Sequence, residues 1–417
     1  MSTASPQNDG SVSVGGWRTA AVIILAGAVV LGMNMGLRQT FGLFIEPMTL
    51  ELGISRSNFS LSIAVQNLLW GLFTPFFGIL ADRFGTGRSV ALGGLLYGLG
   101  IVLMALGDSA TALHIGNGLF VGTAVAACGY PLVLSAVARA VSEERRAMAL
   151  SLAATGGSVG QFVLLPLTQA MIDTIGWQNA LLVLAALGFM VVPLAAVLTG
   201  KPATDPSQGS RGPQASIAGA LRQAAGHRGY WLLNAGFFVC GFHVSFIATH
   251  LPGYIVTCHL PAFVGATALG VIGFFNILGG LATGPLGSRY RKKYLLTGIY
   301  LGRAAIIAAF MLGPKTEVTV LAFSAAFGLL WLSTVPLTSG LVGDIFGPRY
   351  MATLYGVVLF SHQIGAFFGA WLGGLNYDAT GNYNVVWGIS VLLGLFAALL
   401  HWPIPDRRVG APEAAKA

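Results

Sequence analysis

Two basic side chains interrupt stretches of sequence that are otherwise uncharged. Arg38 follows an uncharged run over residues 19–37, and His243 lies inside a longer one over 229–288. A guanidinium is always charged and presents a planar fork that matches a carboxylate. An imidazole changes charge near neutral pH, so it can bind an anion when protonated or carry a proton. Arg38 and His243 are therefore the first candidates for anion binding.

Both candidates also have a purely structural interpretation. Arg38 could contact a backbone carbonyl or Glu46, and His243 could remain neutral against a hydroxyl or a carbonyl. His250 lies seven residues after His243, about two helical turns further and on a similar face. It is a second candidate for proton coupling, nearer the end of its helix.

Other polar or aromatic side chains in apolar stretches could join a binding cavity. For any one of them, packing or a hydrogen bond between helices is the more frequent role. We keep three as candidate substrate-binding residues, namely Tyr130, Trp331 and His362, and note Gln66, Asn67 and Asn276 as further polar groups.

The sequence offers no signature of catalysis, of a metal site or of a cofactor. It has no metal-ligand cluster and no convergent pair of acids. Cys128, Cys240 and Cys258 lack metal or redox spacing and are expected to be small apolar residues. We therefore predict a protein that is not an enzyme.

The composition sets the environment of these side chains. Of the 417 residues, 55% are hydrophobic and only 9% are charged, whereas a soluble protein carries about 25% charged residues. Most of the surface must therefore face something other than water. The 58 glycines suit a bundle of closely packed membrane helices.

Stretches without Asp, Glu, Lys or Arg mark the membrane spans, because a helix needs about 20 apolar residues to cross the hydrocarbon. The run over 229–288 is too long for one span, and Pro252, Gly253, His259 and Pro261 are expected to divide it. A further helix over about 294–313 contains Arg303, which we expect to have a structural role within the C-terminal half. The runs that define the spans are 19–37 (continuing to about Ile45), 57–81, 89–107, 109–138, 147–172, 174–200, 229–288, 318–343, 350–377 and 379–405. Together they predict twelve membrane helices.

The basic residues predict the orientation of these helices. Only Arg56 and Lys315 fall in loops on one side, Arg38 and Arg303 lie within spans, and all other Lys and Arg residues fall on the opposite side. Cytoplasmic loops retain positive charge. We therefore expect a multi-pass protein of the inner (plasma) membrane with both termini in the cytoplasm. This bias also accounts for the net charge of +8 without a nucleic-acid partner.

Acidic residues are missing from the middle of every predicted span. Glu46, Asp108, Asp173 and Asp378 all fall towards outer ends. A cavity that contains an arginine and no embedded acid should carry a positive potential. The expected substrate is therefore a small organic anion.

The chain divides into two halves that repeat each other. A shift of 205 residues pairs Gly36 with Gly241, Pro131 with Pro336, Gly160 with Gly365, Asp173 with Asp378, and Arg38 with His243. The predicted segments are a tail (1–18), a six-helix bundle (19–199), a linker (200–228) with a short amphipathic helix, a second six-helix bundle (229–403) and a tail (404–417). Two such halves in the same orientation imply a pseudo-two-fold axis along the membrane normal, with the substrate path between them. Arg38 and His243 should then face each other.

The loop after the second span reads Gly78-Ile-Leu-Ala-Asp82-Arg83-Phe-Gly85-Thr-Gly-Arg88. This pattern resembles the G-x-L-a-D-R-x-G signature between helices two and three of the major facilitator superfamily. A second copy begins at Gly284 and includes Arg289, with Ser288 in place of the acid. The resemblance implies a fold of two pseudo-symmetric six-helix bundles, with these loops acting as gates that break as the halves rock.

Within that superfamily, the segment from Gly36 to Pro47 resembles bacterial relatives of the monocarboxylate transporters and oxalate–formate antiporters. The resemblance implies transport of a monocarboxylate by alternating access, and it leaves open whether protons are coupled in symport. We expect the transporter to be a monomer. The alternative is an exporter of drugs or neutral solutes from the same superfamily. The helix-five pattern of drug–proton antiporters does not match the sequence around Gly160.

Overall fold

The protein was analysed as a computed structural model, which describes residues 19–200, 217–347 and 351–406. Within these ranges the chain is helical, and twelve helical segments are long and apolar enough to cross a membrane. The predicted all-helical architecture of twelve spans is therefore confirmed. The tails and most of the linker, for which the sequence also made predictions, lie outside the described residues.

The N-terminal half contains the first six spans. Its helices are α1 (Ala20–Thr40), η1 (Phe41–Phe44), α2 (Ile45–Leu52), α3 (Arg56–Phe84), α4 (Thr86–Leu106), α5 (Ala110–Leu113), η2 (His114–Val121), α6 (Gly122–Ala127), α7 (Tyr130–Arg139), α8 (Glu143–Ile175) and α9 (Trp177–Ala195). The first span combines α1, η1 and α2, and the fourth combines α5, η2, α6 and α7.

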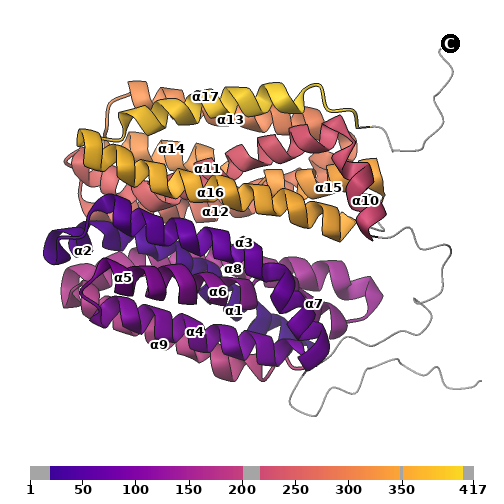
Figure 1. The fold of residues 1–417 in the computed structure, drawn as a ribbon, viewed down its shortest axis with the longest axis horizontal. Helices are drawn as coiled ribbons and strands as arrows, with labels where there is room; N and C mark the ends of the chain where they lie inside the picture. Colours follow the sequence, from indigo (N-terminus) through magenta and orange to yellow (C-terminus); the bar gives the residue numbers. More distant parts are fainter. Residues whose placement is uncertain (1–18, 201–216, 348–350, 407–417) are drawn as a thin grey trace, which may run out of the picture.

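The C-terminal half contains the other six spans. After the short linker helix α10 (Ile217–Ala225), its helices are α11 (Arg228–Thr257), α12 (Ala262–Arg289), α13 (Lys292–Leu312), α14 (Glu317–Leu329), α15 (Thr334–Phe346), α16 (Met351–Thr380) and α17 (Asn384–His401). Figure 1 shows the two halves as two stacked bundles, with α2 at one end of the long axis and α10 at the other. We call these ends the α2 end and the linker end.

Two predicted boundaries differ from the structure. The first span does not stop near Ile45 but continues to Leu52. The long run over 229–288 is divided at His259 and Pro261, two of the residues expected to do so, but not at Pro252 or Gly253, since α11 passes through both and ends at Thr257. A proline inside a helix costs one backbone hydrogen bond but need not end it when neighbouring helices pack around it. The turn that separates the spans contains His259, whose φ is 61°.

Spans four and ten are each interrupted in the middle, at places related by the repeat. Span four leaves the helical path at Cys128 and Gly129, and span ten between Leu329 and Thr334. Such breaks leave carbonyls without helical partners, which must be satisfied in another way.

Side chains from neighbouring spans bond to these freed carbonyls. The Nδ2 of Asn34 donates to the carbonyl oxygen of Cys128 at 3.1 Å. In the other half the fully buried Arg303 donates from Nη2 to the carbonyl oxygens of Leu330 (2.7 Å) and Trp331 (2.6 Å). Arg303 thus has the structural role within the C-terminal half that the sequence predicted.

The repeated glycines mark where spans approach most closely. Span one packs on span five and span seven on span eleven, and these are the two most extensive helix contacts. A Cβ added at Gly160 would overlap the carbonyl oxygen of Gly32, and one at Gly365 would overlap that of Phe238. The repeat therefore preserves the small residues that let two helix backbones touch.

The loops at the linker end are held by basic residues. Gly85 has a φ of 96°, a backbone conformation that glycine adopts readily. Arg139 donates from Nη2 to Thr86 Oγ1 at 2.7 Å, which ties the end of span four to this loop. In the second half Lys292 pairs with Asp344 at 2.6 Å. Arg291 donates to Asp406, and this bond holds the pKa of the Asp406 carboxyl below its usual value.

Candidate functional site

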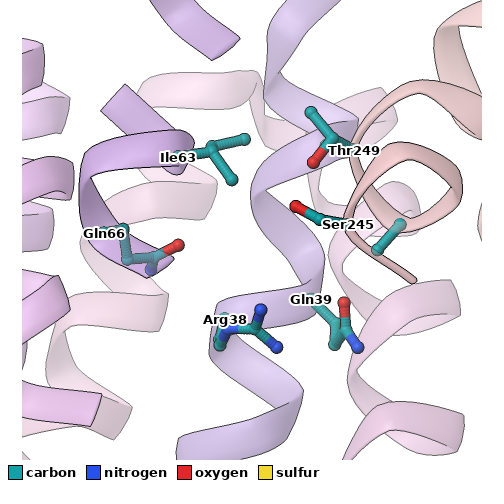
Figure 2. Close-up of a pocket in the computed structure, with 8 residues that line it drawn as sticks. Arg38, Gln39, Ile63, Gln66, Ser245 and Thr249 are labelled. Atoms are coloured by element: carbon teal, nitrogen blue, oxygen red, sulfur yellow. The ribbon is translucent and has the colours of Figure 1, made fainter. Parts of the chain in front are cut away.

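A small polar pocket lies between the two halves, where α1 and α3 of the first half face α11 of the second. It is lined by Arg38, Gln39, Gly42, Ile63, Gln66, Ser245, Ala248 and Thr249. Figure 2 shows the polar ends of Arg38 and Gln66 on one side and the hydroxyls of Ser245 and Thr249 on the other. The pocket therefore draws its groups from both halves.

Arg38 is the only charged residue among those that line the pocket. Its Nη2 donates to Asn67 Oδ1 at 2.5 Å, and its guanidinium lies over the Trp70 ring, 4.7 Å from the centroid. Its Nε has no hydrogen-bond partner. The four ion pairs found among the described residues do not include Arg38. A cation in these surroundings favours an anion, since an unpaired charge is costly to bury.

Gln66 adds unused hydrogen-bonding capacity beside this cation. The residue is 1% exposed, and neither its side-chain nitrogen nor its oxygen has a partner. Buried polar groups normally find partners. Gln66 can therefore donate from its amide nitrogen to a carboxylate, and its amide oxygen can accept from a ligand hydroxyl or amine.

The pocket is almost closed in this conformation. Its volume is about 10 Å³, roughly the room that one water needs. On the side towards the α2 end, η1 and α11 approach closely, because a Cβ at Gly42 would lie 2.6 Å from the carbonyl oxygen of Ala248. A solute of several heavy atoms can enter only if the two halves move apart.

Near the α2 end the halves are joined by a network of Glu46, Arg56, Tyr377, Asp378 and Tyr383, which we call the cross-half network. Arg56 forms an ion pair with Glu46, donates to Tyr383 Oη at 2.9 Å, and lies 3.8 Å from the Tyr377 ring centroid. Asp378 accepts from the backbone nitrogens of Arg56 (3.2 Å) and Ser57 (2.8 Å), so it caps the N-terminus of α3 from the other half.

The cross-half network also tests one structural role considered for Arg38, a contact with Glu46. Glu46 is bonded to Arg56, and Arg38 turns instead to Asn67 and Trp70. The suggested contact between Arg38 and Glu46 is therefore wrong for this conformation. In the part of the chain that the structure describes, Arg38 lines the pocket without an acidic partner.

His243 and His250 do not line this pocket. The Nε2 of His243 bonds to the carbonyl oxygen of Ser390 on α17 at 2.8 Å, and that of His250 bonds to Ala370 on α16 at 2.7 Å. Both rings are buried inside the C-terminal half. The expectation that His243 faces Arg38 across the interface is wrong for this conformation, because their side chains leave equivalent helices in different directions.

The other three predicted residues also lie within single halves. Tyr130 donates weakly to the carbonyl oxygen of Ala154 at 3.5 Å. Trp331 is fully buried in the break of span ten, with its ring 5.8 Å from that of Phe327. His362 packs 4.9 Å from the Phe237 ring. The structure thus does not bring these residues together with Arg38.

Several pocket residues were not among the predicted binding residues. Ser245, Ala248 and Thr249 have the i, i+3, i+4 spacing of one helical face on α11. His243 lies two residues from Ser245, about 200° around the helix. This spacing could have indicated the face of α11 that lines the pocket. Of the pocket residues other than Arg38, only Gln66 was noted from the sequence, as a polar group inside an apolar span.

The architecture and the site together define a class of protein. Two similar six-helix bundles enclose a polar pocket at their interface, and twelve spans place that pocket within a membrane. This is the arrangement of a secondary transporter. The model of the Major Facilitator Superfamily matches residues 24–370. The chain therefore belongs to the major facilitator superfamily, so it is a membrane transporter and not an enzyme.

Its relatives are similar over nearly the whole chain. It is 28% identical to monocarboxylate transporter 13 of Bos taurus, covering 91% of this chain and 88% of that protein. It is also 28% identical to monocarboxylate transporter 11 of Homo sapiens (94% and 83%). Identity to the MFS-type transporter YcxA of Bacillus subtilis is 23% (93% and 95%).

Solved structures support the fold. The nucleoside transporter NupG, solved as a mutant, has a TM-score of 0.76 at 12% identity, covering 91% of this chain and 98% of that one. A bacterial homologue of the human lysosomal transporter Spinster, in an inward-facing and occupied conformation, has a TM-score of 0.73 at 15% identity, covering 93% and 97%.

Proposed function

We propose that this transporter moves a small organic anion, specifically a monocarboxylate, by alternating access, with Arg38 binding the carboxylate. The observation that carries this proposal is Arg38 itself, a cation at the interface of the halves without an acidic partner among the described residues. A substrate carboxylate would replace Asn67 as the partner of its fork.

The geometry of the halves supports the same proposal. Hydrogen bonds between the halves include those of the cross-half network and the bond from Asn67 Nδ2 to Ser245 Oγ beside the pocket. Between α8 and α12, Gln161 Nε2 donates to the carbonyl oxygen of Leu269 and Asn276 Nδ2 donates to Ser158 Oγ. We propose that this conformation is closed at the α2 end and that the linker end faces the cytoplasm, as the basic residues of the loops suggest. The proposed location is the inner (plasma) membrane, with both termini cytoplasmic and a monomer as the working unit.

The relatives support the substrate class. Two of those named above are monocarboxylate transporters, and each is similar across more than nine-tenths of this chain. A neutral solute is the alternative substrate. The amides and hydroxyls that make up half of the pocket lining favour it: Gln39, Gln66, Ser245 and Thr249.

A thermal-shift screen of the purified protein tests the substrate class. Carboxylates of increasing length should raise the unfolding temperature in a concentration-dependent way, because a ligand that binds only the folded state stabilises it by mass action. The matching amides, which have the same shape but no charge, are the control. Stabilisation by the amides but not by the acids would replace the anion proposal with the neutral-solute alternative.

Proton coupling is the second part of the proposal, with His243 as the candidate group and His250 as the alternative. His243 uses only Nε2 for its bond to Ser390, and its Nδ1 has no partner. This free nitrogen supports a role in taking up a proton when the halves rearrange.

We expect His243→Gln to flatten the pH dependence of uptake in proteoliposomes, because glutamine keeps a polar side chain but cannot titrate. His401→Gln is the matched control. His401 is also fully buried in the C-terminal half and bonded through one ring nitrogen to a carbonyl, that of Ala397. A wild-type pH profile in His243→Gln would exclude His243 as the coupling group.

A further inference from the structure

Asn276, near the middle of α12, bonds to two other segments of the chain at once. Its Oδ1 accepts from the backbone nitrogen of Leu332 at 3.1 Å. Its Nδ2 donates to Ser158 Oγ on α8, in the opposite half, at 3.1 Å. One side chain therefore links the break of span ten to the other half of the molecule.

The break itself is pressed against α12. A Cβ added at Gly279 would overlap the carbonyl oxygen of Leu329, and one at Gly328 would lie 2.8 Å from the carbonyl oxygen of Ile272. On the other side Arg303 fixes the carbonyls of Leu330 and Trp331. The break is thus clamped between α12 and α13, and Asn276 is the side chain of α12 that holds the backbone nitrogen of Leu332.

The contact with Ser158 lies where α8 and α12 cross at mid-depth. Towards the α2 end the two helices stay in contact, with Gln161 bonded to the carbonyl oxygen of Leu269 and the ring of Phe162 5.8 Å from that of Phe274. Towards the linker end, a Cβ added at Gly280 would meet nothing within 4 Å. The bond between Asn276 and Ser158 therefore lies at the margin of the contact that must change when the halves rock.

We propose that Asn276 is a positioning residue for transport, which couples the break of span ten to the contact between the halves through Ser158. When α8 and α12 separate, the hydrogen bond from Asn276 to Ser158 breaks. The Asn276 amide can then rotate, and its hydrogen bond with the backbone nitrogen of Leu332 is released. Span ten can then change its bend together with the movement of the halves. This proposal rests on the alternating access proposed above but not on the identity of the substrate.

Hydrogen–deuterium exchange in the purified transporter tests the coupling directly, with the peptide that contains residues 329–334 as the readout. Ser158→Ala is the decisive variant. Ser158 lies in the opposite half and, within the described residues, is connected to the break only by its hydrogen bond with Asn276, so a change at the break must pass through that bond. We expect it to speed exchange at the break about threefold, the typical effect of one hydrogen bond between membrane helices. Asn276→Ala should give at least this effect, and the double variant no more than Asn276→Ala alone.

The control is Asn234→Ala. Asn234 is 7% exposed, close to the 8% of Asn276, but its Nδ2 donates only to Tyr230 on its own helix. It should leave exchange at the break unchanged. If Ser158→Ala also leaves it unchanged while Asn276→Ala speeds it, Asn276 is only a local cap and the coupling is refuted. Should Asn276→Ala fail to fold, Ser158→Ala alone still decides between these outcomes.

Discussion

Arg38→Gln is expected to lower uptake of the carboxylate substrate in proteoliposomes by roughly tenfold or more while the protein still folds. Glutamine can keep a hydrogen bond to Asn67, but it offers no charge and no fork. A hydrogen bond to a charged group contributes about 1.5–3 kcal/mol, so the loss of the cation should lower the uptake rate by roughly tenfold to more than a hundredfold.

Two further variants separate the charge from its geometry. Arg38→Lys keeps the charge but loses the planar contact over Trp70, so it should restore only part of the uptake. Arg222→Gln removes one positive charge from the exposed face of α10 and should transport like the wild type. Wild-type uptake by Arg38→Gln would refute the assignment of the binding site, although not the membership in the superfamily.

Gly365→Ala is expected to destabilise the folded protein strongly. The added Cβ would overlap the carbonyl oxygen of Phe238, an atom of the helix backbone that cannot swing away as a side chain could. α11 and α16 would have to separate along one of the longest contacts in the molecule. Overpacking of this kind costs about 1–3 kcal/mol or more, so the unfolding temperature in detergent should fall clearly.

Gly356→Ala provides the control on the same helix. A Cβ at Gly356 would meet nothing within 4 Å, and alanine is the better helix former by about 1 kcal/mol. This variant should be as stable as the wild type or more so. Equal unfolding temperatures for the two variants would mean that the close approach of α11 and α16 does not limit stability.

The fold could be predicted almost completely from the sequence. The twelve spans and the two-fold repeat both follow from local properties: the length of uncharged runs and the positions of glycine. The glycine pairs have a direct structural meaning, because Gly160 and Gly365 are the points where two backbones touch in each half. The break after span seven falls at His259 and Pro261, as expected, but Pro252 does not end the helix. It lies inside α11, packed against α12.

The candidate site could be predicted only in part. Arg38 was found because a charge inside an apolar span is rare and costly. Its partner in the repeat, His243, was expected in the same cavity, but it points to Ser390 within its own half. A long arginine side chain can reach over Trp70 towards the interface, whereas an imidazole remains on the helical face from which it starts.

The sequence alone determined that a cation lies within a membrane bundle, because Arg38 interrupts an uncharged run and hydropathy depends only on the local composition of the chain. Only the tertiary structure decided what surrounds that cation. Its neighbours come from two other helices, namely Gln66, Asn67 and Trp70 from α3 and Ser245 from α11. Successive side chains point about 100° apart around a helix. Which faces meet therefore depends on how the helices are rotated and packed, so the composition of the pocket follows from contacts between segments far apart in the sequence.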